Sequence, residues 1–224
     1  MDDRIARLRQ RWSDPLLTAL TVLLVIMLFV AAPLQASGII VFQAFELIFA
    51  FVLVAGAFVM SGSRRAVAAM LVSLAMATVG AIYRIRSPSD LDINLFAGAW
   101  LVMGITMGWV VTGAVFAPGR ITYHRVMGAV LLYLTIAVIF VPLYAFVGST
   151  IPKAFNGIAM QDTPALASNL IYFSFVTLTT TGYGDVFPVH PIARAMCNVE
   201  AIIGQLYPAT LLARLVTLEM AHRS

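Results

Sequence analysis

Long apolar runs separated by short polar connections make up most of this chain. A helix needs about 20 apolar residues to cross a bilayer, and six of the runs reach or approach that length. Short connections place consecutive helices side by side in antiparallel order. The pattern therefore predicts an all-α membrane protein with six transmembrane helices, at 15–35, 39–60, 66–83, 94–117, 126–148 and 191–217.

The composition supports a membrane protein. Hydrophobic residues make up 61% of the 224 residues and charged residues only 11%. A soluble domain of this length cannot bury so much apolar surface, so the bilayer is the expected solvent. A single cysteine excludes a disulfide within the chain and a cysteine-based metal cluster. The net charge of +4 is spread over short loops, which indicates a membrane face and not a nucleic-acid partner.

The arginines predict the orientation of the spans. An excess of basic residues marks cytoplasmic loops, and ten arginines fall on one side of the six spans. Both termini of a multi-pass protein of the cell (plasma) membrane are therefore expected in the cytoplasm. Residues 1–14 would form an interfacial segment and 218–224 a cytoplasmic tail, while Gly148 to Pro191 would face outward. The ten are Arg4, Arg7, Arg9, Arg11, Arg64, Arg65, Arg120, Arg125, Arg214 and Arg223.

One segment between the last two spans does not fit a membrane helix. Residues 168–179 are apolar but only about half the length of a span, and TTTGYGD follows, from Thr179 to Asp185. Non-helical backbone is tolerated at membrane depth only where protein covers it or where it lines a water-filled path. Gly182 and Gly184 can adopt left-handed torsions. If such torsions alternate, successive carbonyls face one way and can replace the water around a dehydrated cation.

This segment resembles the selectivity filter of the potassium-channel family, which reads Thr-Val-Gly-Tyr-Gly, usually followed by Asp. The corresponding residues here are Thr180, Thr181, Gly182, Tyr183, Gly184 and Asp185. The resemblance implies passive, selective conduction of dehydrated potassium on the fourfold axis of a homotetramer. Thr180 to Gly184 would form the filter, with potassium bound at Thr180, Thr181, Gly182 and Tyr183. It implies no cofactor, no nucleic-acid partner and no catalytic residue, so the protein is not expected to be an enzyme.

The resemblance extends over a pore domain at 126–217. Its parts would be an outer helix at 126–148, a pore helix at 168–179 capped by Ser168 or Asn169, a filter at 180–184 and an inner helix at 191–217. Filter support would come from Asp185, Tyr172, Thr179 and Glu200.

Three positions depart from the family's pattern. Thr181 replaces the usual valine, which adds a hydroxyl behind the filter. Val176 stands where some relatives place a glutamate that bonds the filter aspartate, and Tyr172 and Phe173 stand where many relatives have two tryptophans. A bond from the Tyr172 hydroxyl to the Asp185 carboxylate is therefore the expected clamp on the filter.

Two residues of the predicted inner helix are candidates for gating. Gly204 lies 19 residues after Asp185, where the family carries a glycine hinge; close helix packing is the other reading of this glycine. Pro208 follows one turn later, and its missing N–H and its ring would kink the helix. That kink is either part of gating or static.

Glu200 is a carboxylate inside a span, where ionisable groups are costly and often functional. The favoured interpretation is a bond from Glu200 to the back of the pore helix, at Ser174, Thr177 or Thr179, which would brace the filter. The alternatives are that Glu200 faces a water-filled cavity and attracts cations, or that it is protonated in the packing.

Residues 15–117 are expected to form a four-helix transmembrane domain that does not sense voltage. A voltage sensor works by moving charge through the field, at about 2.3 kcal/mol per charge per 100 mV. The fourth span, 94–117, contains no basic residue. Gly104 and Gly108 instead have the G-x-x-x-G spacing that suits close helix packing.

Other polar residues allow simpler interpretations. Glu46, inside the second span, is expected to pair with Arg84 or Arg86. His190, near the outer mouth, is either a sensor of external pH or, more simply, a surface histidine. His124, in the linker before the fifth span, is expected to be solvated.

Three other functions remain as alternatives. A non-selective cation pore differs from a potassium channel only in its ion preference. A potassium-uptake transporter subunit carries four degenerate filter segments in one chain, whereas this chain has one intact copy. A membrane enzyme would need a catalytic constellation inside the bilayer, and no histidine lies within a predicted span.

Overall fold

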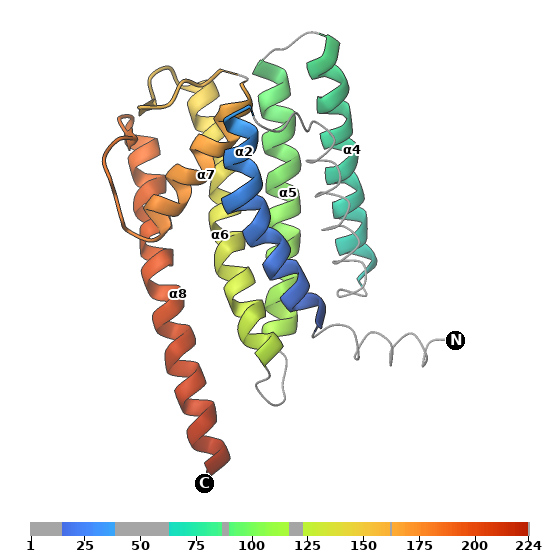
Figure 1. The fold of residues 1–224 in the computed structure, drawn as a ribbon, viewed down its shortest axis with the longest axis vertical. Coiled ribbons are helices and arrows are strands. Elements are labelled where there is room, and N and C mark those ends of the chain that lie inside the picture. The colour runs from blue at the N-terminus through green and yellow to red at the C-terminus, as the bar shows by residue number, and fades with distance from the viewer. Residues whose placement is uncertain (1–14, 39–62, 87–89, 117–122, 162, 224) are drawn as a thin grey trace.

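The computed structural model describes residues 15–38, 63–86, 90–116, 123–161 and 163–223, which form a helical bundle (Figure 1). The predicted interfacial segment at 1–14, the span at 39–60 and Glu46 lie outside these residues. Within the described part, α4 packs on α5, α5 on α6, α6 on α7 and α7 on α8.

The first helix covers Pro15–Ala36 and changes its winding on the way. Residues 15–26 are α-helical, η1 (Met27–Ala31) is a π-helical turn and α2 (Ala32–Ala36) completes the helix. The π turn lies just before Pro33, whose nitrogen has no hydrogen to bond to the preceding turn, and wider turns accommodate such a gap. Phe29, within this turn, has its ring centroid 4.9 Å from that of Phe175 in the later helix α7.

The next three described helices are α4 (Arg64–Arg86), α5 (Asp90–Val115) and α6 (Tyr123–Thr150). They overlap the predicted spans at 66–83, 94–117 and 126–148. Four helices of the described part are long and apolar enough to cross a membrane: Pro15–Ala36, Arg64–Ile82, Ile93–Val115 and Tyr123–Thr150.

Beyond α6 lie the strands β1 (Phe155–Asn156) and β2 (Phe187–Pro188), the short helix α7 (Pro164–Leu178) and the long helix α8 (Pro191–Arg223). β1 and β2 are antiparallel, with Phe155 opposite Pro188 and Asn156 opposite Phe187. α7 descends partway along the bundle and the chain then returns to the same end, where β2 and α8 begin (Figure 1).

The prediction that Ser168 or Asn169 caps the short helix is wrong. α7 begins four residues before Ser168, with Thr163 in extended conformation and Pro164 at the first helical position. Proline is well suited to that position because its fixed φ matches the helix and its missing N–H would have no partner there. The sequence signal that the prediction passed over is therefore Thr163-Pro164.

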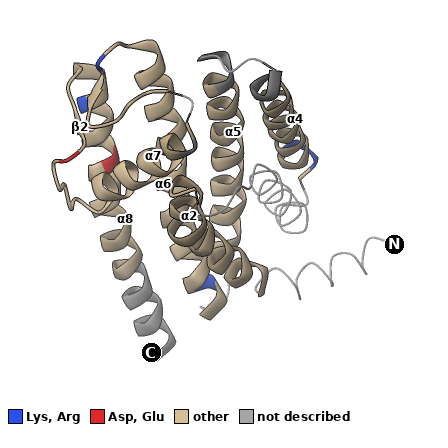
Figure 2. Ribbon diagram, turned by 45° about the horizontal axis from the view of Figure 1, so that its top comes forward, with Lys and Arg blue, Asp and Glu red and all other residues tan. Residues whose placement is uncertain are grey.

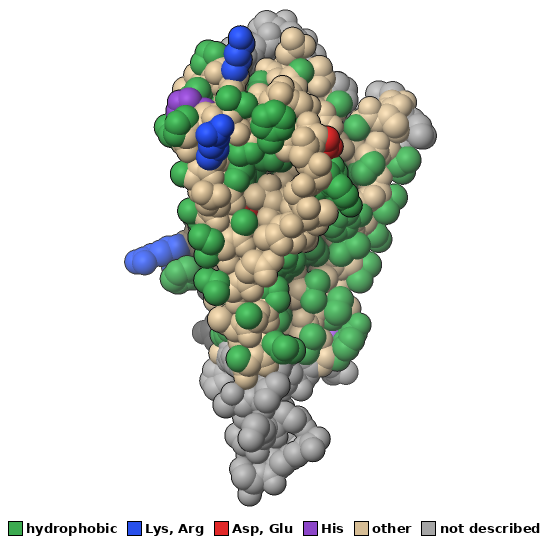
Figure 3. Space-filling model, turned by 90° about the vertical axis from the view of Figure 1, so that its left-hand side faces the viewer, with side chains coloured by type: hydrophobic (Ala, Val, Ile, Leu, Met, Phe, Trp, Pro, Cys, Tyr) green, Lys and Arg blue, Asp and Glu red, His purple; other side chains and the backbone are tan. Residues whose placement is uncertain are grey.

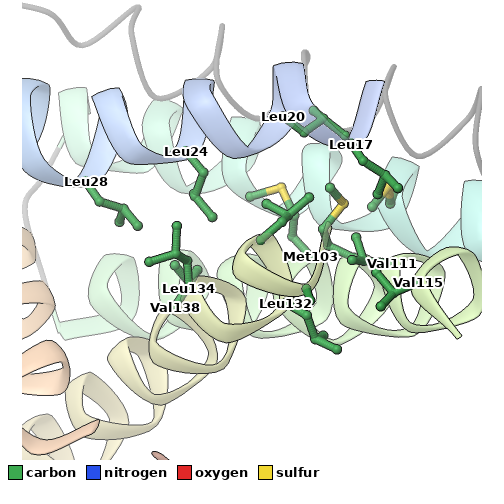
Figure 4. Packing of buried hydrophobic residues seen from close by; sticks show 14 residues of the cluster. Leu17, Leu20, Leu24, Leu28, Met103, Val111, Val115, Leu132, Leu134 and Val138 are labelled. Atoms are coloured by element: carbon green, nitrogen blue, oxygen red, sulfur yellow. The ribbon is translucent and has the colours of Figure 1, made fainter. Parts of the chain in front are cut away.

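Two hydrophobic cores hold the described helices together. The first joins the helix at 15–36 to α5 and α6, with Leu17, Leu20, Leu24 and Leu28 pointing toward side chains of both (Figure 4). The second joins α6, α7, α8 and β1 around Tyr144 and Phe173. In the described part, the first helix and α5 thus pack against the outer and short helices of their own chain.

The close packing predicted for the fourth span is confirmed. A Cβ atom on Gly104 would lie 2.9 Å from Cγ1 of Ile139, closer than such contacts occur. Gly108, one turn later, faces Leu132, Thr135 and Ile139 at ordinary contact distance. The two glycines therefore let α5 approach α6.

Hydroxyl groups inside the bundle bond to backbone carbonyls. Ser73 donates to the carbonyl of Ala99 at 2.6 Å and so links α4 to α5. Thr21 Oγ1 lies 2.7 Å from the carbonyl oxygen of Leu17 on its own helix and 2.9 Å from that of Met127 on α6. Few charged residues lie along the described helices (Figure 2). His124, expected to be solvated, is half-buried, and its Nδ1 lies 2.8 Å from Oγ1 of Thr18 on the first helix.

The packing of α5 on α6 predicts that Gly104→Leu destabilises the protein. The added side chain would overlap Ile139, and overpacking typically costs about 1–3 kcal/mol. Gly113→Leu is the matched control, since a Cβ atom on Gly113 meets nothing within 4 Å. Thermal unfolding in detergent should show a lower midpoint for Gly104→Leu only; equal midpoints would contradict this packing.

Candidate functional site

The TTTGYGD segment begins where α7 ends, and the end of the helix fixes its first residues. Thr180 donates its backbone N–H to the carbonyl of Thr177 at 2.9 Å, and Thr181 donates to that of Val176 at 2.9 Å. These two bonds form the Schellman motif that ends many helices, in which the residue after the C-cap is left-handed and is usually glycine. Here that residue is Thr180, with φ of 56°.

Left-handed torsions recur at every second residue of the segment. φ is 56° at Thr180, 56° at Gly182 and 81° at Gly184. The two glycines adopt these values without steric cost. A β-branched residue does not: the conformation costs about 1–3 kcal/mol and persists only where the surroundings hold the residue in it. Thr180 is therefore a strained position held by its neighbours.

The threonines at the start of the segment form a chain of hydroxyl bonds. Thr179 Oγ1 donates to the carbonyl of Phe175 at 2.6 Å and lies 2.8 Å from Thr181 Oγ1. Because the hydrogen of Thr179 is used at Phe175, Thr181 is the donor between the two hydroxyls. The hydroxyl that Thr181 adds in place of valine thus has a partner.

The expected bond between Tyr172 and Asp185 is confirmed. The Tyr172 hydroxyl donates to Asp185 Oδ2 at 2.8 Å, and the other carboxylate oxygen accepts the backbone N–H of Val186 at 3.0 Å. The ring of Tyr172 also stacks on that of Tyr183, with centroids 6.3 Å apart and planes 5° apart. Tyr172 therefore contacts the segment at two places.

The strand pair fixes the far end of the segment. β1 pairs with β2 just after Asp185, and a Cβ atom on the adjoining Gly157 would overlap the carbonyl oxygen of Asp185. His190 accepts the backbone N–H of Ile192 on Nδ1 at 3.3 Å, at the start of α8. His190 thus has a structural contact of its own at the beginning of this helix.

α8 approaches the other end of the segment at Gly204. A Cβ atom there would overlap the carbonyl oxygen of Leu178, the last residue of α7. The structure thus gives Gly204 a packing role. α8 runs without interruption through Gly204 and Pro208, and Tyr207 beside the proline donates to the carbonyl of Ala129 on α6 at 2.8 Å.

Glu200 is completely buried between three helices, with 0% of its surface exposed. One carboxyl oxygen contacts Ser174 of α7 and the other contacts the hydroxyl of Tyr144 of α6. The predicted bond to Ser174 is confirmed. The predicted bonds to Thr177 and Thr179 are wrong, because those hydroxyls donate to carbonyls of their own helix.

The hydrogens of this cluster can be counted. Ser174 Oγ lies 2.9 Å from the carbonyl oxygen of Ala137 as well as against Glu200. One hydroxyl hydrogen cannot serve both acceptors. Every group has a partner when Ser174 donates to Ala137, a protonated Glu200 donates to Ser174, and Tyr144 donates to Glu200.

Sequence reasoning missed two residues of the site. Tyr144 reaches Glu200 from 56 residues away in the chain, and Gln205 Nε2 donates to Thr180 Oγ1 at 2.8 Å. The signal available in the sequence was that each is a polar side chain inside a predicted apolar span, where a polar side chain usually has a partner.

The segment itself lies at the surface of the chain. All residues from Thr179 to Asp185 are exposed, including Tyr183 at 72%. Figure 3 shows the side of the molecule that carries α8, where backbone and polar side chains form a broad area between apolar ones. Among the described residues, no group of three or more His, Cys, Asp or Glu side chains forms a metal site. The exposed residues of the segment carry carbonyl and hydroxyl oxygens, which can act as ligands for a cation.

The hydrogen count predicts how variants of Glu200 behave. Glu200→Gln keeps one donor for Ser174 and one acceptor for Tyr144, so the unfolding midpoint should stay near that of the unchanged protein. Glu200→Val removes the acceptor of the Tyr144 hydroxyl and the donor to the Ser174 oxygen, and an unsatisfied buried group costs about 1–3 kcal/mol. Thermal unfolding at neutral pH should separate the two variants, and equal loss of stability in both would refute the count.

Comparison with known proteins identifies the family of the chain. The family model described as "Ion channel" matches residues 128–220, which include α7, the TTTGYGD segment and most of α8. Protein LctB of Bacillus caldotenax is 31% identical over 121 residues, which cover 53% of this chain and 88% of LctB. A search of solved structures found no significant match. The chain therefore belongs to the ion channel family and is potassium-channel-like.

Proposed function

We propose that this protein is a potassium-selective channel in which residues 180–184, the filter segment, line the ion path. The observation that carries the proposal is the left-handed torsion at Thr180, Gly182 and Gly184, between a half-length helix and a long one. Alternating torsions turn successive carbonyls to one side. A row of carbonyl oxygens replaces the hydration shell of potassium in this family.

Four copies are proposed to surround the path. One filter segment cannot enclose an ion, and in the single chain this segment is exposed. Exposed irregular backbone is not tolerated in lipid and needs protein or a water-filled path around it. Cyclic symmetry closes such a ring with identical contacts. In a homotetramer, the exposed backbone of every copy is therefore surrounded by the other copies and by the ion path.

The remaining helices are proposed to anchor the pore in the membrane and not to sense voltage. The described side chains of α5 from Ile93 to Val115 include no charged residue, so this stretch of the helix carries no charge to move in the field. The six-span arrangement with both termini in the cytoplasm of the plasma membrane remains part of the proposal. Gating is proposed for α8, with bending near Gly204 and Pro208.

Selectivity tests the filter assignment. In the single chain a Cβ atom on Gly184 meets nothing within 4 Å, so within its own chain Gly184→Ala adds torsional strain, at a φ of 81°. That strain is about 1–2 kcal/mol per chain, comparable with the ~1.4 kcal/mol of a tenfold change in an equilibrium. Reversal potentials in liposomes with opposed potassium and sodium gradients should show a large loss of potassium preference.

The matched control for this experiment is Gly113→Ala, which also meets nothing within 4 Å but lies in a regular helix. It should keep the preference of the unchanged channel. Sodium exclusion that survives in Gly184→Ala would show that the filter segment is wrongly assigned. A non-selective pore in the unchanged protein would favour the alternative function.

Assembly is tested separately. Native mass spectrometry in detergent should give the mass of four chains for the conducting protein, because fewer copies leave the ring of carbonyls open. Purified fractions are then assayed for potassium flux after reconstitution. Flux from a monomeric or dimeric fraction would contradict the tetramer.

A further inference from the structure

Gln205 and Thr180 form a side-chain contact that the proposed function does not require. The amide nitrogen of Gln205 donates to Thr180 Oγ1 at 2.8 Å. Both partners are held in place: Gly204 brings α8 against the carbonyl of Leu178, and the end of α7 fixes the backbone of Thr180. The packing of two helices therefore fixes the backbone on both sides of the bond.

The Thr180 hydroxyl is at the same time open to an ion. Thr180 and Gln205 are both exposed, on the part of the chain that also exposes the filter segment. A hydroxyl oxygen has two lone pairs. The amide N–H of Gln205 occupies one, which leaves the other for a cation.

Two electropositive partners that share one oxygen weaken each other's binding to it. The N–H of an amide carries partial positive charge, so its bond to Thr180 Oγ1 reduces the attraction of that oxygen for a cation. Four copies of the amide would act on one ring of four hydroxyls in the proposed tetramer. Conduction requires binding weak enough for the ion to leave.

We infer that Gln205 sets the affinity of the ion site at the Thr180 hydroxyl, the first site of the filter segment after α7, by donating a hydrogen bond to the oxygen that binds the ion. This inference rests on the proposed function. It assigns Gln205 a role in how tightly ions are held and not in which ion is chosen, because the amide contacts the hydroxyl and not the carbonyls further along.

A purely supporting role for Gln205 predicts the opposite result. If the amide only held Thr180 in its strained torsion, its removal would disorder the site and weaken ion binding. If the amide competes with the ion, its removal strengthens binding. The sign of the change therefore separates the two roles.

The test is Gln205→Met, which keeps the length of the side chain and removes the donor. Single-channel conductance in planar bilayers is measured against symmetric potassium concentration. The half-saturating concentration should fall by about two- to tenfold, the range that one net hydrogen bond contributes, while the potassium-to-sodium permeability ratio stays unchanged. An unchanged or raised half-saturating concentration would overturn the inference.

Variants of Thr180 show whether the effect acts through its oxygen. In a Thr180→Ser background the hydroxyl remains, so Gln205→Met should still lower the half-saturating concentration. In a Thr180→Val background the oxygen is absent, so Gln205→Met should have no further effect. The same shift in both backgrounds would also overturn the inference. Isothermal titration of potassium into purified protein gives the same comparison for any variant that does not conduct.

A failure of the proposed channel function would give a different result from a failure of the role inferred for Gln205. An unchanged protein that neither conducts nor binds potassium refutes the channel assignment itself. An unchanged protein that conducts selectively, together with a Gln205→Met variant that saturates at the same concentration, refutes only the role of Gln205.

Discussion

The close contact between α8 and the end of α7 is the constraint on which the site depends. Gly204 places the backbone of α8 against the carbonyl of Leu178, and no side chain fits between them. Immediately after this carbonyl the chain leaves the helix, turns through the left-handed Thr180 and enters the filter segment. The position of this segment relative to α8 is thus set by backbone contact, which is less compressible than a contact between long side chains.

Satisfaction of polar groups is the second constraint, because water is scarce in the interior of a membrane protein. The cluster of Glu200, Ser174 and Tyr144 joins α6, α7 and α8 and leaves no hydrogen unused when the carboxyl group is protonated. Tyr172, two residues before Ser174, bonds to Asp185 beyond the filter segment. Polar contacts thus hold the C-terminal half of this short helix, in addition to its apolar packing.

How far the sequence predicts this structure depends on the range of the interaction. The described spans follow from apolar run lengths, and the Tyr172–Asp185 bond follows from a motif whose parts lie 13 residues apart. The apolar pattern predicts too late a start for α7, because the helix begins at Thr163-Pro164, a proline signal outside that pattern. The contacts of Tyr144 and Gln205 join residues 56 and 25 positions apart. The pattern of apolar residues predicts where a helix lies in the chain, but not which other helix its polar side chains face.

The packing of α8 also determines which movements this helix can make. Its buried positions Ala193, Cys197, Glu200 and Gly204 recur every three or four residues and form one stripe along the helix. Rotation of α8 about its own axis would separate all four from α6 and α7 at once, and sliding along the axis would displace Gly204 from Leu178. Beyond Gly204 the fully buried positions end: Tyr207 and Leu211 are only half-buried against the first core, and residues 208–210 are exposed. Packing therefore fixes the first half of α8. The movement of this helix that disrupts the fewest contacts is bending of its C-terminal half.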